Sequence, residues 1–286
     1  MSAAGATTTM TRRWLVGPGV ALAATVAGGA RTEVRAVIRR GRQTGTPEPG
    51  AQGRLLARPA PPTEPIAPGL HRLGLDRARD AVLLVPAGYR PDRAAPFVLS
   101  LHGAGGDAEG GLYPLRDLAD EAGLVLLAPA SRGPTWDVIR GGFGPDVAFI
   151  DAALAAAFAR VAVDPTRLAV GGFSDGASYA LSLGLGNGDL FGHLLAFSPG
   201  FAAPAAQTGE PRIFVSHGTR DEVLPIDRCS RRLVPPLQRA GYDVTYVEFD
   251  GGHTVPSEIA QRALAWFLRG SAPPAERPLP GTPAAG

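Results

Sequence analysis

The stretch "GGFSDGAS" (residues 171–178) places Ser174 between glycines in the middle of the chain. An apolar run (167–173) precedes the serine, and a helical pattern follows it. A strand-to-helix turn this sharp requires strained backbone at the serine, and Gly172 and Gly176 leave room where Cβ atoms would clash. The hydroxyl would project outward at a helix N-terminus, where N–H groups favour a developing negative charge. A Gly-x-Ser-x-Gly motif is weak by itself in a chain this rich in glycine, but this context makes Ser174 a candidate nucleophile.

Short apolar runs alternate with helical patterns over residues 69–270. The middle runs are nearly continuous in apolar residues, as expected of strands that helices cover on both faces. The predicted strands are residues 81–86, 97–103, 124–129, 167–173, 193–199, 212–218 and 243–250.

Helical spacing fills the segments between these strands. In residues 146–161, apolar side chains recur at steps of three and four and form one stripe. Residues 113–123 end on Gly123, a plausible C-terminal cap, and residues 255–270 form a third predicted helix. Strands alternating with helices predict an α/β fold, with a mostly parallel central sheet and helices on both faces. In such sheets the functional groups lie in loops beyond the carboxyl ends of the strands.

A serine hydroxyl needs a base, and the base needs a carboxylate that orients it. Three histidines follow Ser174 in the chain. His193 opens a strand and His217 ends one, so both are expected to be buried histidines with satisfied hydrogen bonds. His253 lies in "DGGHTVP", a glycine-rich loop directly after the last strand, and is the candidate base.

The favoured carboxylate is Asp221, which lies in "VSHGTRDEVLP" just past the end of the preceding strand. Ser, Asp and His then follow one another in separate loops after strands, which is the order found in α/β-hydrolases. Other carboxylates fit this role less well because of their position in the chain: Asp175, Asp189, Asp227 and Asp250.

The negative oxygen of a tetrahedral intermediate needs two backbone N–H donors. One donor is expected from Asp175, the residue after the serine. The other is expected from the glycine-rich loop "LHGAGGDAEGG" (101–111), with Ala104 as the preferred residue and Gly103 as the fallback.

Together, "LHGAGGD", "GGFSDGAS", "SHGTRDEVLPID" and "GGHTVP" resemble the phospholipase/carboxylesterase branch of the α/β-hydrolase superfamily. That branch is close to acyl-protein thioesterases and to secreted esterases that resemble polyhydroxybutyrate depolymerases. The resemblance implies a serine esterase without a metal or an organic cofactor. It gives Ser174 the role of nucleophile, Asp221 that of orienting acid and His253 that of base. Thioesterase relatives typically have Gln after the serine where this chain has Asp175, which weakens the thioesterase subtype.

The expected substrate is a carboxylic ester with a short or medium acyl group, or the exposed end of a polymer. The connection between the strands ending near residue 198 and starting at residue 212 is short, which predicts an open site without a large lid. Trp136 and Phe143, in the long loop 130–146, are candidate substrate contacts, although both could simply pack that loop.

Other functions stay open at this stage. A hydrolase fold can serve as a non-catalytic binding or surface protein, although the complete Ser, Asp and His set speaks against that. A peptidase or thioesterase of the same fold is a further alternative. No His, Asp and Glu residues have metal-ligand spacing, so a metal site is not predicted. The net charge of +2 gives no reason to expect a nucleic-acid partner.

The two ends of the chain differ from its middle. Residues 1–30 place Arg12 and Arg13 before a short apolar run, the layout of an export signal that loosely resembles a twin-arginine motif. They predict a periplasmic or extracellular protein without a stable membrane span; without export, the protein would be cytoplasmic. Residues 31–68, rich in Pro, Gly and Arg, are expected to form a mostly unstructured linker, and residues 271–286 a disordered tail.

Overall fold

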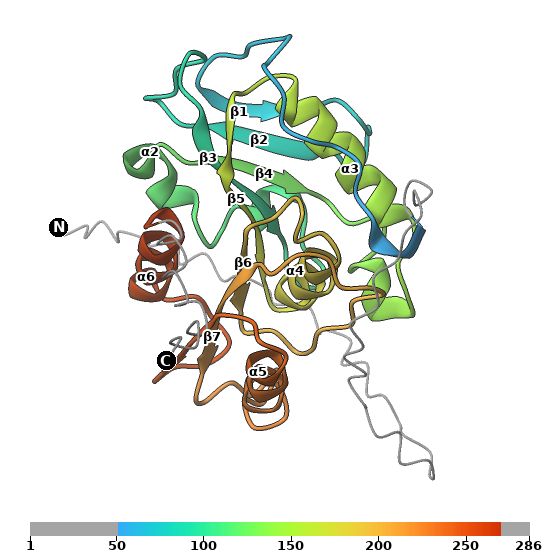
Figure 1. Ribbon diagram of the computed structural model, residues 1–286, viewed down its shortest axis with the longest axis vertical. Helices are drawn as coiled ribbons and strands as arrows, with labels where there is room; N and C mark the ends of the chain where they lie inside the picture. The colour runs from blue at the N-terminus through green and yellow to red at the C-terminus, as the bar shows by residue number, and fades with distance from the viewer. Residues whose placement is uncertain (1–50, 270–286) are drawn as a thin grey trace, which may run out of the picture. The chain divides into compact units, whose positions relative to one another are not determined.

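The computed structural model describes residues 51–269, so the predicted export segment, the first part of the linker and the tail lie outside the described residues. One eight-stranded sheet organises this part of the chain, in the order β1-β2-β4-β3-β5-β6-β7-β8 (Figure 1). The strands are β1 (Gly69–Arg72), β2 (Ala81–Val85), β3 (Ala95–Leu101), β4 (Val125–Pro129), β5 (Val163–Phe173), β6 (His193–Phe197), β7 (Arg212–Gly218) and β8 (Val244–Phe249).

The six strands from β4 to β8 in that order run parallel, whereas β1 pairs antiparallel with β2 and β2 pairs antiparallel with β4. The predicted α/β fold with a mostly parallel sheet is therefore confirmed. Because parallel strands end at the same edge, the segments that follow β3, β5, β7 and β8 meet there. Those segments contain the residues predicted to form the site.

Helices cover both faces of the sheet. Figure 1 shows α3, α4 and α5 on one side and α2 and α6 on the other. The helices are α1 (Ala108–Gly111), α2 (Ala119–Ala122), α3 (Pro145–Phe158), α4 (Asp175–Gly186), α5 (Ser230–Arg239) and α6 (Ser257–Leu268), with short 3₁₀ helices η1 (Ala51–Gly53), η2 (Arg116–Leu118) and η3 (Asp137–Arg140).

The alternating side chains of β6 show how the two hydrophobic cores are divided. Leu194 and Ala196 belong to the core that contains residues of α3, α4 and α5. Leu195 and Phe197 belong to the core that contains residues of α1, α2 and α6. Successive side chains of a strand point to opposite faces, so a continuously apolar strand supplies both cores.

All seven predicted strands are present within a few residues of their predicted ends, whereas β1 and α5 are not among the predicted elements. β1 is a short edge strand with alternating exposure, and α5 contains Pro235 and Pro236, which obscure a helical pattern. The helix predicted over 113–123 is present only from residue 116 and is not one α-helix, because the chain forms η2 over 116–118 and α2 over 119–122. Gly123 does end α2 in the left-handed conformation, with φ 61°.

The connection between β6 and β7, residues 198–211, contains neither a helix nor a strand. Across residues 51–269, none of the helices has the length and apolar character needed to cross a membrane.

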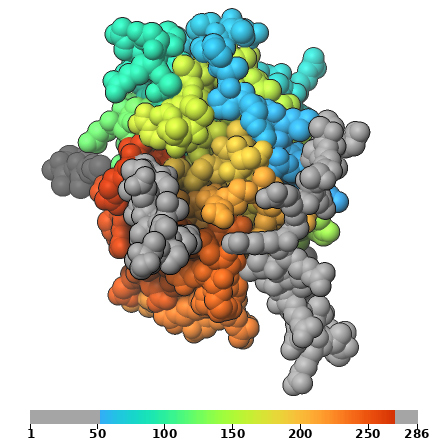
Figure 2. Space-filling view, in the orientation of Figure 1, coloured from blue at the N-terminus to red at the C-terminus, as the bar shows by residue number. Residues whose placement is uncertain are grey.

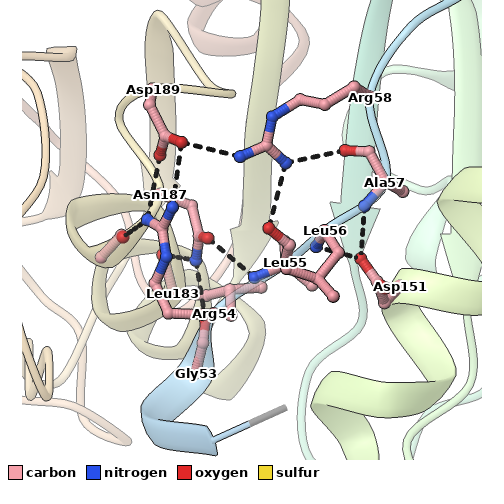
Figure 3. Close-up of polar contacts among 11 residues, drawn as sticks. Gly53, Arg54, Leu55, Leu56, Ala57, Arg58, Asp151, Leu183, Asn187 and Asp189 are labelled. Atoms are coloured by element: carbon pink, nitrogen blue, oxygen red, sulfur yellow. Dashed lines mark hydrogen bonds and ion pairs between the residues drawn. The ribbon is translucent and has the colours of Figure 1, made fainter. Parts of the chain in front are cut away.

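The prediction that residues 31–68 form a mostly unstructured arm is wrong for the segment 53–58, which we call the strap. Leu55 is fully buried in the core beside α3 and α4. Its backbone N–H donates to the Asn187 side-chain oxygen at 2.9 Å, and the Asn187 amide donates to the carbonyl oxygens of Gly53 and Leu183, at 2.8 Å each (Figure 3). The composition of this segment alone indicates a linker. The segment is nevertheless ordered, because Leu55 is buried and the Asn187 amide pairs all its hydrogen-bonding groups with backbone partners.

Ion pairs and charged side chains at the surface also hold the strap in place. Arg54 and Arg58 both contact Asp189, at 2.9 and 2.7 Å, so this aspartate is paired rather than simply solvated. Asp151 of α3 accepts the backbone N–H groups of Leu56 and Ala57 (Figure 3). Figure 2 shows the blue N-terminal part of the described chain lying along the surface against elements that come much later in the sequence.

Candidate active site

Ser174 lies at the turn between β5 and α4, as predicted. Its backbone has φ 58° and ψ −120°, a region that L residues rarely adopt. The Ser174 N–H donates to the carbonyl oxygen of Phe197 at 2.9 Å, which ties the strained residue to the end of β6. The strained backbone fixes the direction of the Ser174 side chain. Its hydroxyl therefore lies at a defined place at the N-terminus of α4.

The two glycines of the motif are required by close packing against the end of β3. A Cβ atom at Gly172 would lie 2.6 Å from the Leu101 carbonyl oxygen, and one at Gly176 would collide with the carbonyl oxygens of Leu101 and His102. Neither glycine has a positive φ, so the need is for space rather than for a special backbone conformation. The sequence-based interpretation of both glycines therefore holds.

The structure brings Ser174, His253 and Asp221 together. The distance between Ser174 Oγ and His253 Nε2 is 2.8 Å, and that between His253 Nδ1 and Asp221 Oδ2 is 2.6 Å. Ser174 is 7% exposed and Asp221 5%, and the His253 side chain is 15% exposed. Each residue comes from a different loop at the carboxyl edge of the sheet, after β5, β7 and β8.

This arrangement assigns the protons. A carboxylate can only accept, so His253 Nδ1–H donates to Asp221 and, in the neutral ring, the lone pair lies on Nε2. Nε2 can then accept the hydroxyl proton of Ser174. The other carboxylate oxygen, Asp221 Oδ1, accepts the backbone N–H groups of Val223 and Leu224 at 2.9 and 2.8 Å. These two bonds hold the carboxylate facing the imidazole.

The loop after β3 lies directly beside the serine. A Cβ atom at Gly103 would lie 3.5 Å from Ser174 Cβ, an ordinary contact distance. The backbone N–H groups of Gly105 and Gly106 are occupied by the carbonyl oxygens of Pro134 and Gly103. By contrast, the N–H groups of Ala104 and Asp175 find no acceptor within residues 51–269. These are the two donors that the sequence predicts for an oxyanion hole.

His102 shapes this loop, and sequence analysis gave it no role. Its Nε2 accepts the Ser131 N–H at 3.0 Å, so Nδ1 is the protonated nitrogen and donates to the Gly103 carbonyl oxygen at 2.7 Å. Burial lowers the pKa of His102, which keeps the ring neutral and this pattern fixed. Its position directly before the glycines of "LHGAGG" was the only indication in the sequence.

Trp136 is not a substrate contact in this structure, which corrects the prediction. The side chain is fully buried, its Nε1–H donates to the His102 carbonyl oxygen at 2.9 Å, and its ring stacks on Tyr179 with centroids 5.0 Å apart. A buried indole N–H needs an acceptor, and the backbone of the loop after β3 supplies one. Phe143 is half-buried and packs on Tyr179 and Gly53, so both aromatics of the loop 130–146 pack the fold.

Two other aromatic residues lie next to the site, and the sequence analysis missed them. The Phe173 ring lies 4.6 Å from the His253 ring, and the Tyr113 ring meets Phe173 edge-on at 6.2 Å. The Tyr113 hydroxyl donates to the Val255 carbonyl oxygen at 3.4 Å, in the loop that follows His253. Tyr113 is nevertheless 54% exposed. An exposed ring at this place offers apolar surface beside the serine.

The other residues weighed for the site have different partners. Asp227 pairs with Arg231, Asp250 pairs with Arg220, and Asp175 accepts a hydrogen bond from Thr135 at 2.6 Å. His217 is fully buried and hydrogen-bonded, as predicted. His193 is buried too, but neither ring nitrogen has a partner among the described residues, which corrects the expectation for that histidine.

Comparison with known families matches residues 147–269 to the Phospholipase/Carboxylesterase family. Among solved structures, esterase PE8 superposes with a TM-score of 0.53 at 23% identity, covering 65% of this chain and 96% of that chain. The described part of the chain has the α/β-hydrolase fold. A ferulic acid esterase from the fungus Anaeromyces mucronatus shares this α/β-hydrolase fold, with a TM-score of 0.53 at 18% identity over 69% of this chain and 88% of its own.

Two proteins resemble this chain in sequence. Feruloyl esterase C of Emericella nidulans is 28% identical over 158 residues, 52% of this chain and 57% of the relative. Acyl-protein thioesterase 1 of Gibberella zeae is 29% identical over 121 residues, 38% of this chain and 50% of the relative. The chain thus spans about half the length of these relatives.

Proposed function

We propose that this α/β-hydrolase cleaves carboxylic esters through an acyl-enzyme intermediate, with Ser174 as the nucleophile. One observation supports the proposal above the others: a single line of hydrogen bonds runs from Ser174 Oγ through His253 to Asp221. A hydroxyl, an imidazole and a carboxylate in this order are what nucleophilic acyl transfer requires.

In the proposed first step, His253 Nε2 takes the Ser174 proton as the serine oxygen attacks the ester carbonyl. Asp221 stabilises the imidazolium that forms, because its carboxylate accepts the Nδ1–H. The tetrahedral intermediate collapses when the imidazolium protonates the leaving alcohol oxygen, which leaves the acyl group on Ser174. Water, deprotonated by His253, then attacks the acyl-enzyme. The imidazolium returns the proton to Ser174 Oγ as the acyl C–O bond breaks, which releases the carboxylic acid and regenerates the hydroxyl.

Asp175 and Ala104 are the proposed donors to the negative oxygen of the tetrahedral intermediate, with Gly103 as the fallback for Ala104. The free N–H groups of Asp175 and Ala104 support this role. The Asp175 N–H also lies at the positive end of α4, where the helix dipole adds to the stabilisation. Loss of one such donor typically lowers kcat by about 10²–10³-fold.

The proposed substrates are esters of short or medium acyl groups, or accessible ester groups at a polymer end. The helix-free connection between β6 and β7 supports an open site. The names of the feruloyl esterase relatives make feruloyl esters a natural choice for the test. The exposed Tyr113 ring, edge-on to Phe173, offers an aromatic substrate group a surface beside the serine.

The test is hydrolysis of p-nitrophenyl esters from acetate to palmitate, of methyl ferulate and of an acyl thioester, by the parent protein and by Ser174→Ala. We expect ester hydrolysis that falls by about 10⁴-fold or more in the variant. Tyr113→Ala should raise the KM of aryl esters selectively. Turnover of the thioester alone would favour the thioesterase alternative, and equal activity in parent and Ser174→Ala would refute the proposed nucleophile. If neither protein turned over any substrate, the non-catalytic binding protein would replace the esterase.

A further inference from the structure

A second histidine lies against the carboxylate of the proposed site. His217, in the last turn of β7, is fully buried. Its Nε2 lies 2.7 Å from the Leu224 carbonyl oxygen and 3.3 Å from Asp221 Oδ2. Its Nδ1 lies 2.7 Å from Ser230 Oγ, at the start of α5. The proposed mechanism gives this histidine no part.

These contacts allow one protonation pattern. A carbonyl oxygen can only accept, so Nε2 of His217 carries a hydrogen and donates it to the Leu224 carbonyl oxygen. Asp221 Oδ2 lies 3.3 Å from the same nitrogen. In the neutral ring, Nδ1 then accepts the Ser230 hydroxyl hydrogen. Burial lowers the pKa of His217, which favours this neutral ring. The Ser230 hydroxyl therefore stabilises the His217 tautomer that carries its hydrogen on Nε2, the nitrogen nearest to the Asp221 carboxylate.

Both histidines converge on the same oxygen. Asp221 Oδ2 accepts the His253 Nδ1–H at 2.6 Å and faces the His217 Nε2–H at 3.3 Å. Asp221 Oδ1 is held independently by the backbone N–H groups of Val223 and Leu224. Loss of the His217 N–H would thus leave the carboxylate in place but give His253 a larger share of its charge.

We propose that His217 is a positioning residue for the esterase site: its Nε2–H, in the tautomer that Ser230 favours, closes the turn 217–224 by donating to Leu224 and lies against Asp221 Oδ2, the oxygen that accepts from His253. The catalytic consequence rests on the proposed function, but the effect on the His253 ring does not. The titratable groups that face His217 are Asp221 and His253 from the site loops and Glu248 from β8, and the Cys229 thiol lies near Asp221.

The experiment follows the ring signals of His253 by NMR as a function of pH, together with the pH profile of kcat/KM for a p-nitrophenyl ester. With five histidines in the chain, single-site variants can assign the signals. His217→Leu removes the N–H, whereas His217→Gln keeps an amide N–H close to the position of Nε2. His193→Leu is the matched control, because it makes the same change at a buried histidine on the neighbouring strand.

In His217→Leu the titration midpoint of His253 should rise by about 0.5 to 1 pH unit, because the His217 N–H no longer lies against the carboxylate that stabilises the imidazolium. The plateau of kcat/KM should fall by about tenfold. His217→Gln should recover most of both values, and Ser230→Ala should give a smaller change in the direction of His217→Leu. His193→Leu should move neither.

A folded His217→Leu protein whose His253 midpoint matches the parent would overturn the proposal, as would an equal shift in His193→Leu. If the parent hydrolyses no ester, the proposed function fails, yet the NMR midpoints still decide whether His217 acts on His253 through Asp221. The two failures are therefore distinguishable.

Discussion

Ser174 and Asn187 are the residues that flank helix α4 at its N-terminus and C-terminus, and the polar groups at these two ends differ in their hydrogen bonding. At the first end the serine has a strained backbone, and the Asp175 N–H has no acceptor among the described residues. At the other end the buried Asn187 side chain accepts one hydrogen bond and donates two, all to backbone groups (Figure 3). The strained backbone and the free N–H donor at the Ser174 end indicate a site for chemistry. The fully hydrogen-bonded side chain at the Asn187 end indicates a role in stability.

The largest expected effect is the separation of activity from stability at the Ser174 end. Ser174→Gly should abolish ester hydrolysis, by about 10⁴-fold or more, because no nucleophile remains. It should also raise the free energy of unfolding by about 1 kcal/mol, since glycine adopts a positive φ without strain. Kinetics and urea denaturation of the same preparations measure both quantities.

Ser198 provides the control for this prediction. It has φ 52° and a buried hydroxyl without a partner among residues 51–269, but it has no role in the proposed chemistry. Ser198→Gly should gain similar stability and retain hydrolysis. A Ser174→Gly protein less stable than the parent would contradict the view that this end of α4 is strained.

At the Asn187 end the expected effect is on stability. Asn187→Ala removes three buried hydrogen bonds and leaves backbone groups of Gly53, Leu55 and Leu183 without partners. We expect a loss of about 3–4 kcal/mol in the free energy of unfolding, or roughly 6–16 °C in Tm. Hydrolysis well below Tm should stay close to the parent rate. Loss of activity without loss of stability would show that the two ends are not separate in function.

Acid should weaken the fold through β6, on which the C-terminal half of α4 packs. His193 at the start of β6 is 1% exposed, lies between Trp266 and Phe267, and has its pKa lowered to about 4, chiefly by burial and secondly by Arg212. The unfolded chain binds this proton near pH 6.5, so stability is full above that pH and falls as the pH drops towards 4.

The expected loss over that range is about 2–3 kcal/mol, and His193→Leu should remove it. Urea midpoints at pH 7 and pH 4.5 for both proteins measure the difference. If the parent and His193→Leu lost the same stability between these two values, another group would be responsible for the acid sensitivity.

The smallest effect concerns the exposed charges of the strap. Arg54 and Arg58 pair with Asp189, whose side chain is 36% exposed. Replacement of both arginines by glutamine should lower the free energy of unfolding by only about 0.5–1 kcal/mol, and 0.5 M NaCl should reduce the difference. A loss as large as that of Asn187→Ala would mean that charge, rather than the buried amide, holds the strap.

The sequence predicts local geometry well at positions where steric space or burial allows only one kind of residue. The glycines around Ser174, the glycine-rich loop before His253 and the continuously apolar strands each have a strict steric or burial requirement. For that reason the sheet and the meeting of Ser174, Asp221 and His253 follow from motifs and their order.

Contacts between residues far apart in the chain explain what the sequence did not predict. The strap depends on Asn187, more than 130 residues away, and no local pattern distinguishes it from a linker. The sequence does not show that Trp136 is buried, because the acceptor of its indole N–H, the His102 carbonyl oxygen, lies 34 residues earlier in the chain. Tyr113 reaches the site through Phe173 and through Thr254 and Val255, which lie 141 and 142 residues later in the chain.

Covalent labelling of the serine tests the central claim most directly. The protein is treated with a fluorophosphonate, and the modified residue is identified by intact mass and peptide mapping. The account predicts one adduct on Ser174, absent from Ser174→Ala and formed much more slowly in His253→Ala, because the imidazole activates the hydroxyl. Labelling of Ser174→Ala at the parent rate, or of another residue in the parent, would contradict the assignment of Ser174 as the nucleophile.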